Sequence, residues 1–406
     1  MYGLELAGED DRFAAAEAAT AAAGVAVVAP GLATAGAVDR ARLRGLAYTH
    51  RALELVGRTA ADVASTRALL AAADLGDRTG TVAVRARDVR AATGTSTAAL
   101  ERELGAVLVD RGFAVDLDDP DHVLRVLLSG PGGELPATAP GTGDGEGDGE
   151  GDGEGGDPAT ASQDRSVADD ARDATGPAAA GPTGGEGPPI RDVPDEGVCL
   201  VGWTVAESVR DFSARLPTDR PFFQPGSMDP KDARAVANLA GTRPGATVVD
   251  PMCGTGGVLV EAGLVGARVV GLDAQSKMVR GARENCRAYL DAPGEGPAAG
   301  TTAVADPGDY DVVRGDATAL PLRADAADGV AFDAPYGRQS KIERHGLDDL
   351  LIGSLAEAAR VAPRAVVVAD RPLRALAVDA GWTVRGVYPR RVHGSLVRYY
   401  HVLDRD

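Results

Sequence analysis

The sequence contains very little lysine and few aromatic residues. Only Lys231, Lys277 and Lys341 are lysines among 42 basic side chains, and aromatic residues make up 4% of the chain. With 60 acidic residues, the formal net charge is −18. Since an acidic, lysine-poor surface suits a protein that stays soluble in concentrated salt, we expect a halophilic source. There the Debye length falls to about 3 Å, which screens repulsion from a polyanion such as RNA.

Cysteine and long apolar runs are scarce as well. Cys199, Cys253 and Cys286 show neither a disulfide framework nor metal-ligand spacing, so we expect reduced thiols and no metal site. No apolar run approaches the roughly 20 residues that cross a bilayer. The first residues lack the basic and apolar regions of a secretory signal. We therefore expect a soluble, cytoplasmic monomer with no membrane partner.

Large apolar residues almost vanish between about residues 130 and 190, where Gly, Asp, Glu, Ala and Pro dominate. Such a segment cannot offset its ordering entropy, so we predict a disordered, solvated acidic insertion rather than a binding tail. Two apolar runs, HVLRVLLS and VCLVGWTV, flank it. We therefore predict that the insertion is the overgrown tip of a β-hairpin, because closure entropy rises only logarithmically with loop length.

Short strand and helix patterns alternate before this insertion, which predicts an α+β arrangement. One helix is expected over TSTAALERELGAVLVDRG, with Ser96 or Thr95 as N-cap and Gly112 as C-cap. From about residue 216 the pattern changes, and helical segments separate the buried runs TVVD, ARVVGLD, YDVVRGD, GVAFDAPY and RAVVVAD. This alternation predicts a doubly wound, mostly parallel sheet. The final runs, WTVRGVYP and SLVRYYHVL, predict an antiparallel closing pair.

A glycine-rich segment, DPMCGTGG, follows the run TVVD. A dinucleotide site would require GxGxxG directly after the strand, whereas here an acidic residue stands at the strand end. A carboxylate would repel a pyrophosphate but suits the ammonium of a methionine moiety, so we predict S-adenosylmethionine (SAM) rather than NAD. The residues expected to contact it are Asp250, Pro251, Cys253, Gly254, Thr255 and Gly256. Cys253 is expected to act by packing, since methylation of an amine needs no enzyme nucleophile.

Two further acids follow the next two predicted strands. Asp273 ends ARVVGLD, where α/β nucleoside sites place an acid against ribose hydroxyls. Asp316, in VVRGDA, is placed to accept from an adenine amino group. Each acid alone could equally be a helix cap or a surface charge. Together, at the ends of successive strands, they predict a cofactor cleft at the carboxyl edge of the sheet.

The fourth strand leads into Asp333-Ala334-Pro335-Tyr336. An exocyclic amine of guanine or adenine is a poor nucleophile, because its lone pair is delocalised into the ring. Asp333 and the Ala334 carbonyl would each accept one N–H and aim that lone pair at the methyl group, while Tyr336 would stack on the base. The alternative is a simple proline-containing turn.

Two weaker segments complete the candidate site. Residues 222–228, FFQPGSM, would cover the cofactor, face RNA or pack in the core. Residues 393–398, HGSLVR, would approach the target nucleotide or its phosphates, although His393 alone is more often structural.

These motifs resemble, in their order, those of the archaeal tRNA (guanine(10)-N2)-dimethyltransferases and their eukaryotic relatives. The blocks that carry the resemblance are RPFFQPGSMDPKDARAVANLA, DPMCGTGGVLVEAGL, MVRGARENC, RGDATALPL, DAPYGRQS and HGSLVRYY. VDLDDPDHVLRVLLS is similar to part of a THUMP RNA-binding domain, which in that family follows a small ferredoxin-like domain. The family usually has Asp-Pro-Pro-Tyr where this chain has Ala334, a change that a backbone carbonyl role tolerates.

The resemblance implies three domains and an archaeal source, which together with the composition means a halophilic archaeon. Residues 1–50 would be ferredoxin-like, 51–215 a THUMP domain with the acidic insertion, and 216–406 a Rossmann-like SAM methyltransferase with a seven-stranded, mostly parallel sheet. SAM contacts would lie at the glycine-rich segment, Asp273 and Asp316, with catalysis at Asp333 to Tyr336 and tRNA as partner. Three alternatives stay open: another tRNA position, ribosomal RNA, or an inactive RNA-binding factor.

Overall fold

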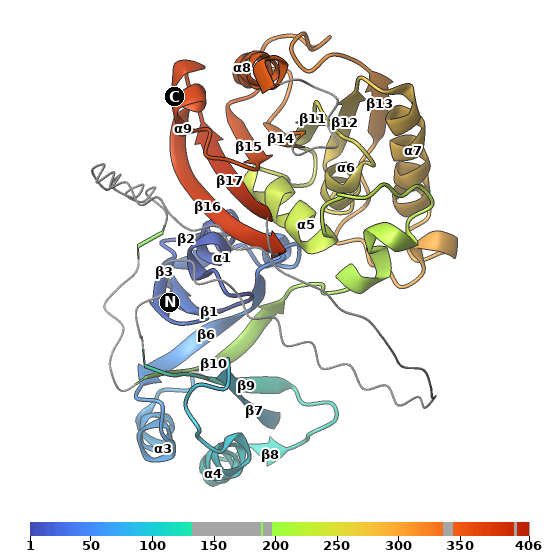
Figure 1. Ribbon diagram of the computed structural model, residues 1–406. Helices are drawn as coiled ribbons and strands as arrows, with labels where there is room; N and C mark the ends of the chain where they lie inside the picture. Colours follow the sequence, from blue (N-terminus) through green and yellow to red (C-terminus); the bar gives the residue numbers. More distant parts are fainter. Residues whose placement is uncertain (132–187, 190–196, 336–343, 394–395, 406) are drawn as a thin grey trace, which may run out of the picture.

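The chain folds around two large β-sheets (Figure 1). A computed structural model describes residues 1–131, 188–189, 197–335, 344–393 and 396–405. The predicted acidic insertion therefore lies almost wholly outside the described residues. In the part that is described, no helix combines the length and the apolar character needed to cross a membrane.

The C-terminal sheet has seven strands in the order β13-β12-β11-β14-β15-β17-β16. Its strands are β11 (Thr247–Asp250), β12 (Arg268–Asp273), β13 (Tyr310–Arg314), β14 (Gly329–Asp333), β15 (Arg364–Ala369), β16 (Thr383–His393) and β17 (Leu396–Asp404). The first five are mutually parallel, and β17 pairs antiparallel with both β15 and β16. The predicted fold class is confirmed, including the closing antiparallel pair.

Helices cover both faces of this sheet, as the continuous apolar strands require. One face packs α5 (Pro230–Leu239), α6 (Gly257–Gly263) and α7 (Ser276–Cys286) over a core that includes Val248 and Val269. The other face packs α8 (Arg344–Val361) and α9 (Arg374–Asp379) over a second core that includes Val249 and Phe332. These helices leave the carboxyl ends of the parallel strands uncovered, and this end of the sheet is called the carboxyl edge below.

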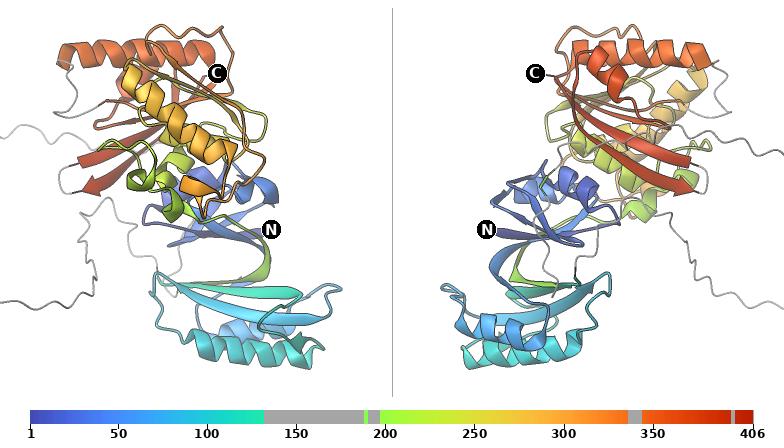
Figure 2. Two further views of the ribbon diagram at one scale, coloured as in Figure 1. Left: turned by 90° about the vertical axis from the view of Figure 1, so that its right-hand side faces the viewer. Right: turned by 60° about the vertical axis from the view of Figure 1, so that its left-hand side comes forward.

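The N-terminal half forms an eight-stranded sheet in the order β3-β4-β1-β6-β10-β9-β7-β8. Its strands are β1 (Tyr2–Leu6), β3 (Ala26–Ala29), β4 (Leu32–Ala35), β6 (Thr49–Thr59), β7 (Thr81–Val89), β8 (Ala114–Val115), β9 (His122–Ser129) and β10 (Val198–Glu207). Its helices are α1 (Asp11–Ala18), α2 (Arg40–Leu43), α3 (Val63–Ala72) and α4 (Thr97–Asp110), and a small sheet pairs β2 (Ala22–Ala23) with β5 (Ala37–Val38). Figure 2 shows α3 and α4 on the side of this sheet that faces away from the rest of the molecule.

Two local predictions for this half can be checked. Strands β9 and β10 pair antiparallel, with Val198 opposite Ser129, which confirms the predicted hairpin on either side of the insertion. Ser96 is the N-cap of α4 and accepts a 3.2 Å hydrogen bond from the Ala99 backbone N–H. Gly112, with φ of 94°, follows the C-cap by one residue.

The expected domain boundary at residue 50 falls inside β6, and both expected N-terminal domains contribute strands to one sheet.

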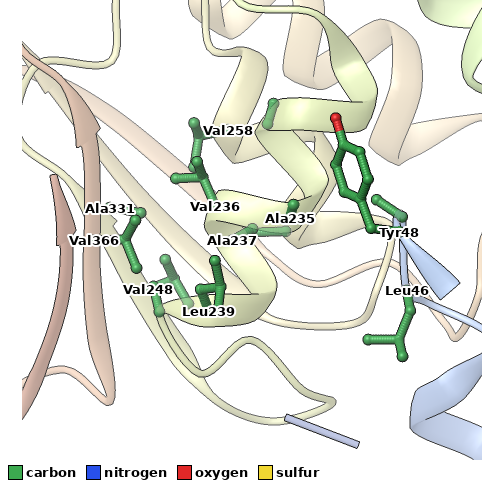
Figure 3. Close-up of a cluster of buried hydrophobic side chains, with 14 of the residues drawn as sticks. Leu46, Tyr48, Ala235, Val236, Ala237, Leu239, Val248, Val258, Ala331 and Val366 are labelled. Atoms are coloured by element: carbon green, nitrogen blue, oxygen red, sulfur yellow. The ribbon is translucent and has the colours of Figure 1, made fainter. Parts of the chain in front are cut away.

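The first 48 residues share a hydrophobic core with the C-terminal sheet. Leu46 and Tyr48 lie in the same buried cluster as Val236 and Leu239 of α5 (Figure 3). The buried carboxylate of Glu17 reinforces this junction. It accepts hydrogen bonds from the backbone N–H groups of residues 47 and 48, and from the Asn238 side chain of α5 at 2.7 Å. The N-terminal half is therefore anchored to the helix that precedes the glycine-rich segment.

Candidate functional site

Three carboxylates meet at the carboxyl edge of the C-terminal sheet. Asp250, Asp273 and Asp333 end β11, β12 and β14, and β11 lies between the other two strands. Burial raises the pKa of Asp250 well above its usual value, and the charges of Asp273 and Asp333 raise it further. Burial also raises the pKa of Asp273. A cationic ligand bound at this edge would stabilise the ionised forms of these carboxyl groups.

The glycine-rich segment wraps over this edge and is held by two of those acids. The Met252 N–H donates to Asp250 Oδ1 at 3.0 Å, and the Gly254 N–H donates to Asp273 Oδ2 at 3.1 Å. Gly256, the N-cap of α6, has φ of 79°. A Cβ there would lie 3.1 Å from the Cβ of Ala282. Only glycine satisfies both the left-handed backbone and the close approach of α7.

Pro251 and Cys253 are packing residues of this segment. Pro251 is buried, and Cys253 is 6% exposed with its thiol 3.2 Å from the position that a Cβ on Gly271 would take. Burial raises the pKa of the Cys253 thiol well above its usual value, and the Asp250 charge adds to this. The thiol is therefore neutral, as expected for a side chain that acts by packing.

Asn285 of α7, which the sequence analysis did not single out, clamps residues 222–228 to the glycine-rich segment. Its buried amide accepts from the Phe222 N–H at 2.9 Å and donates to the backbone carbonyls of Phe222 and Thr255, both at 2.8 Å. Ser227 adds a 3.1 Å hydrogen bond to the Thr255 hydroxyl. The Phe222 ring lies so close to α7 that a Cβ on Gly281 would be 2.0 Å from it. Residues 222–228 therefore do two things: Phe222 packs against α7, and Ser227 contacts the glycine-rich segment.

Asp316 lies just after β13 and is exposed. Its Oδ1 accepts from the backbone N–H and the hydroxyl of Thr318, at 2.9 and 2.8 Å, and these bonds hold its pKa below the usual value. The carboxylate is ionised and closes a local turn. Its predicted adenine contact remains a prediction.

Asp333 has two carboxylate oxygens in different environments. Its Oδ2 lies 3.1 Å from Nη2 of Arg398. Its Oδ1 is buried and has no hydrogen-bond partner among the described residues. Burial raises the pKa of Asp333 to about 7, although the Arg398 guanidinium lowers it. A buried acceptor without a donor costs free energy, so Oδ1 is a position where a ligand N–H would bind.

The residues that follow Asp333 are only partly described. The Ala334 N–H donates to the Val368 carbonyl at 2.8 Å, which ties this turn to β15, and Pro335 is half-buried. Tyr336 lies outside the described residues. In the segment 393–398, Gly394 and Ser395 also lie outside them, whereas Arg398 is 4% exposed beside Asp333.

The hollows elsewhere on the molecule do not coincide with this edge. One of about 510 Å³ is lined by Arg268, Leu290 and Tyr310, near the amino ends of β12 and β13. Because open α/β sheets bind ligands at the carboxyl ends of their strands, we place the site at the edge that carries the three acids. Throughout the described ranges, no cluster of three or more His, Cys, Asp or Glu side chains is arranged to hold a metal ion.

This chain matches one domain family and is similar to several known proteins. Residues 217–293 match the family described as UPF0020, RMKL-like, methyltransferase domain. A tRNA (guanine(10)-N2)-dimethyltransferase of Methanothermobacter thermautotrophicus is 38% identical over 206 residues, which are 49% of this chain and 55% of that protein. The Pyrococcus abyssi protein of the same name is 32% identical over 200 residues, 48% of this chain and 55% of its own. The crystal structure of TrmN from Thermus thermophilus aligns over the whole of both chains, with 20% identity and a TM-score of 0.40.

The matched segment covers little more than half the length of these curated relatives. The family match, over residues 217–293, includes the glycine-rich segment, Asn285 and residues 222–228. The predicted resemblance is therefore confirmed: residues 217–293 match a methyltransferase domain family, and the chain is similar to archaeal tRNA (guanine(10)-N2)-dimethyltransferases.

Proposed function

We propose that this chain uses SAM to methylate the exocyclic N2 amine of a guanine in tRNA, with guanine 10 as the expected target. The observation that carries this proposal is Asp333. It ends β14 beside Asp250 and presents a buried oxygen, Oδ1, that lacks a hydrogen-bond donor among the described residues. An aromatic amine is a donor of the right kind, because its N–H groups point away from the ring edge.

The residues at the carboxyl edge fit SAM. When bound, SAM supplies a methyl group on a positively charged sulfur and also carries an ammonium group. Burial raises the pKa values of Asp250 and of the half-buried Asp273, and a cationic ligand would stabilise their ionised forms. Asp273 and Asp316 are the proposed partners of the ribose and adenine, and residues 250–256 those of the methionine moiety.

The proposed chemistry places the guanine amine between Asp333 Oδ1 and the carbonyl of Ala334. Each accepts one N–H, which directs the nitrogen lone pair toward the methyl carbon. Methyl transfer from bound SAM would form the new N–C bond, break the methyl–sulfur bond and leave one proton to be removed from the nitrogen. With a pKa of about 7, Asp333 can accept that proton and release it to solvent. We propose that Pro335 and Tyr336 complete the pocket, and that a second transfer to the same nitrogen gives the dimethyl product.

A cluster of arginines on the N-terminal sheet supports RNA as the partner. Arg87 and Arg51 both pair with Glu5, at 2.8 and 2.9 Å, and Arg125 lies 3.5 Å from Glu207. The pairing registers of β6, β7 and β9 put the three arginines on the face opposite α3 and α4. Three guanidinium groups share two carboxylates, so this face keeps a positive charge on a chain whose net charge is −18.

The positive charge continues from this face toward α5. Burial, together with nearby positive charges, lowers the pKa of His50 to about 3. These charges belong to Arg210, Arg87, Arg51 and Lys231. Lys231 lies in the first turn of α5, whose Asp232 raises the pKa of Asp333. A row of cations that leads toward the catalytic carboxylate suits a phosphate backbone.

The remaining parts of the proposal concern organisation and source. We propose that residues 1–50 and 51–215 are the ferredoxin-like and THUMP units, which share one sheet, and that residues 216–406 are the methyltransferase unit. The acidic, lysine-poor composition supports a halophilic source, and the similarity to archaeal enzymes supports an archaeon. We also propose that the protein is monomeric and cytoplasmic.

The test is methylation of a tRNA transcript in concentrated KCl with labelled SAM. A matched transcript carries adenine at position 10. Label only with guanine 10, recovered as dimethylguanosine, would establish the proposal. Equal label in both transcripts would move the target to another nucleotide, and no label in any RNA would favour an RNA-binding factor.

The arginine face has its own test within this assay. Arg87→Glu should weaken tRNA binding and raise the apparent KM for tRNA, while the affinity for SAM stays unchanged. Arg268→Glu is the matched control, because Arg268 is an exposed arginine paired with Asp311 on the far edge of the C-terminal sheet. Equal effects of the two variants would remove the argument for this face.

A further inference from the structure

The C-terminal hairpin delivers a nearly buried arginine to the proposed catalytic carboxylate. Strand β17 pairs with β15, and Ala369 lies opposite Tyr399, so Arg398 follows directly at the carboxyl end of β15. Asp333 pairs with Val368 on the other side of β15. Arg398 is 4% exposed, and its Nη2 reaches across to Asp333 Oδ2 at 3.1 Å.

The Arg398 guanidinium also contacts residues 222–228, which are hydrogen-bonded to the glycine-rich segment. Arg398 Nη2 donates to the carbonyl of Gly226 at 3.1 Å. The next residue, Ser227, is hydrogen-bonded to Thr255 at 3.1 Å. Arg398 therefore connects two parts of the site that are more than 100 residues apart in the sequence: the carboxylate that faces the amine and the segment next to the cofactor residues.

This contact makes the two oxygens of Asp333 unequal. Oδ2 is occupied by Arg398, whereas Oδ1 is buried and has no partner among the described residues. A free carboxylate can rotate about its Cβ–Cγ bond and offer either oxygen. One fixed ion pair through a single oxygen selects one orientation.

We propose that Arg398 is a positioning residue for methyl transfer, which holds Asp333 by Oδ2 so that the ionised Oδ1 faces the target amine. The proposal rests on the proposed function, in which Asp333 accepts an N–H of the guanine amine. It assigns Arg398 to the carboxylate, in place of the expected contact with the nucleotide or its phosphates.

The surroundings of Asp333 explain why a cation is needed there. Acidic groups face it from several elements: Asp232 from α5, Asp370 after β15, and Asp250 from β11. Burial raises the pKa of Asp333, Arg398 is the cation that lowers it, and the two aspartates 232 and 370 raise it; the net result is a pKa of about 7. Without Arg398, Asp333 would be protonated over a wider pH range, and a protonated carboxyl group is a poorer acceptor for the amine.

The experiment compares Arg398→Gln, Arg398→Lys and the control Arg385→Gln over pH 6 to 9. Arg385 lies on the same hairpin but pairs with Asp404, away from the site. For Arg398→Gln we expect kcat/KM on tRNA to fall about 100-fold at pH 7. We also expect the midpoint of its pH profile to rise by about one unit or more. In Arg398→Lys the midpoint of the pH profile should stay close to that of the unaltered protein, and Arg385→Gln should match the unaltered protein in both midpoint and kcat/KM.

A purely structural role would give a different result. Activity would then fall by the same factor at every pH with an unchanged midpoint, and that outcome would overturn the proposal. If Arg398→Gln does not fold, Arg398→Lys with its smaller expected midpoint shift decides the question. If the unaltered protein methylates no RNA, the proposed function fails. The pH dependence of unfolding then decides whether Arg398 keeps Asp333 ionised, since a coupled pair would shift that dependence in Arg398→Gln and leave it nearly unchanged in Arg398→Lys.

Discussion

Replacing Asp333 by Asn should remove a loss of stability that grows with pH, while abolishing the proposed methyl transfer. The folded protein raises the pKa of Asp333 from 3.8 to about 7. Between these values the native state keeps a proton that the unfolded state has lost, so the free energy of unfolding decreases as pH rises. Asn does not titrate. The stability of Asp333→Asn relative to the unaltered protein should therefore increase with pH and level off above pH 7.

The magnitude follows from the size of the shift. A difference of roughly three pKa units corresponds to about 4 kcal/mol, with a slope of about 1.4 kcal/mol per pH unit between pH 4 and 7. The side chain keeps 21% of its surface accessible, so this figure is an upper bound. The difference between Asn and a protonated Asp adds an offset that is the same at every pH, because neither form titrates; the contact of the ionised carboxylate with Arg398 is already part of the pKa of about 7.

The assay is urea unfolding at pH 5, 6, 7 and 8 at constant KCl. A Trp203→Phe background leaves Trp382, which is 2% exposed in the core beneath α8, as the fluorescent reporter. Asp311→Asn is the control, because Asp311 and its partner Arg268 are both more than half exposed and such pairs contribute little. A stability difference between Asp333→Asn and the unaltered protein that stays flat from pH 5 to pH 8 would refute the reasoning.

Three further outcomes are expected. SAM binding should release protons and strengthen from pH 5 to 8, because a cation favours the ionised form of the buried Asp250. Calorimetry in buffers of different ionisation heat measures the number of protons released. S-adenosylhomocysteine, which lacks the sulfonium charge, should release fewer protons. Asn285→Ala removes hydrogen bonds to Phe222 and Thr255, so the Kd for SAM should rise about tenfold or more and stability should fall by about 3 kcal/mol; an unchanged Kd would contradict the clamp. Glu261→Gln removes the carboxylate that two buried arginines share, although Arg215 keeps Asp211. This change should cost about 3–5 kcal/mol in urea unfolding, whereas a loss below about 1 kcal/mol would contradict this account.

The sequence alone determined the alternation of strands and helices in the C-terminal half and the acids that meet at the carboxyl ends of its strands. In a doubly wound sheet, apolar runs of strand length can only be buried strands, so acids at their ends, such as Asp250, Asp273 and Asp333, meet at one edge. The hairpin on either side of the acidic insertion could likewise be predicted, because its two apolar runs need each other as partners.

Only the tertiary structure decided which side chains hold that site together. Asn285 and Arg398 lie on α7 and β17, and each contacts residues more than 25 positions away in the sequence. No local pattern marks such a contact, because a buried asparagine or arginine inside a helix or strand has no periodicity of its own. The docking of Glu17 on Asn238, and the single sheet shared by both N-terminal units, also depend on long-range packing. Sequence periodicity fixes which face of an element is buried, whereas the identity of its partner depends on how the whole chain packs.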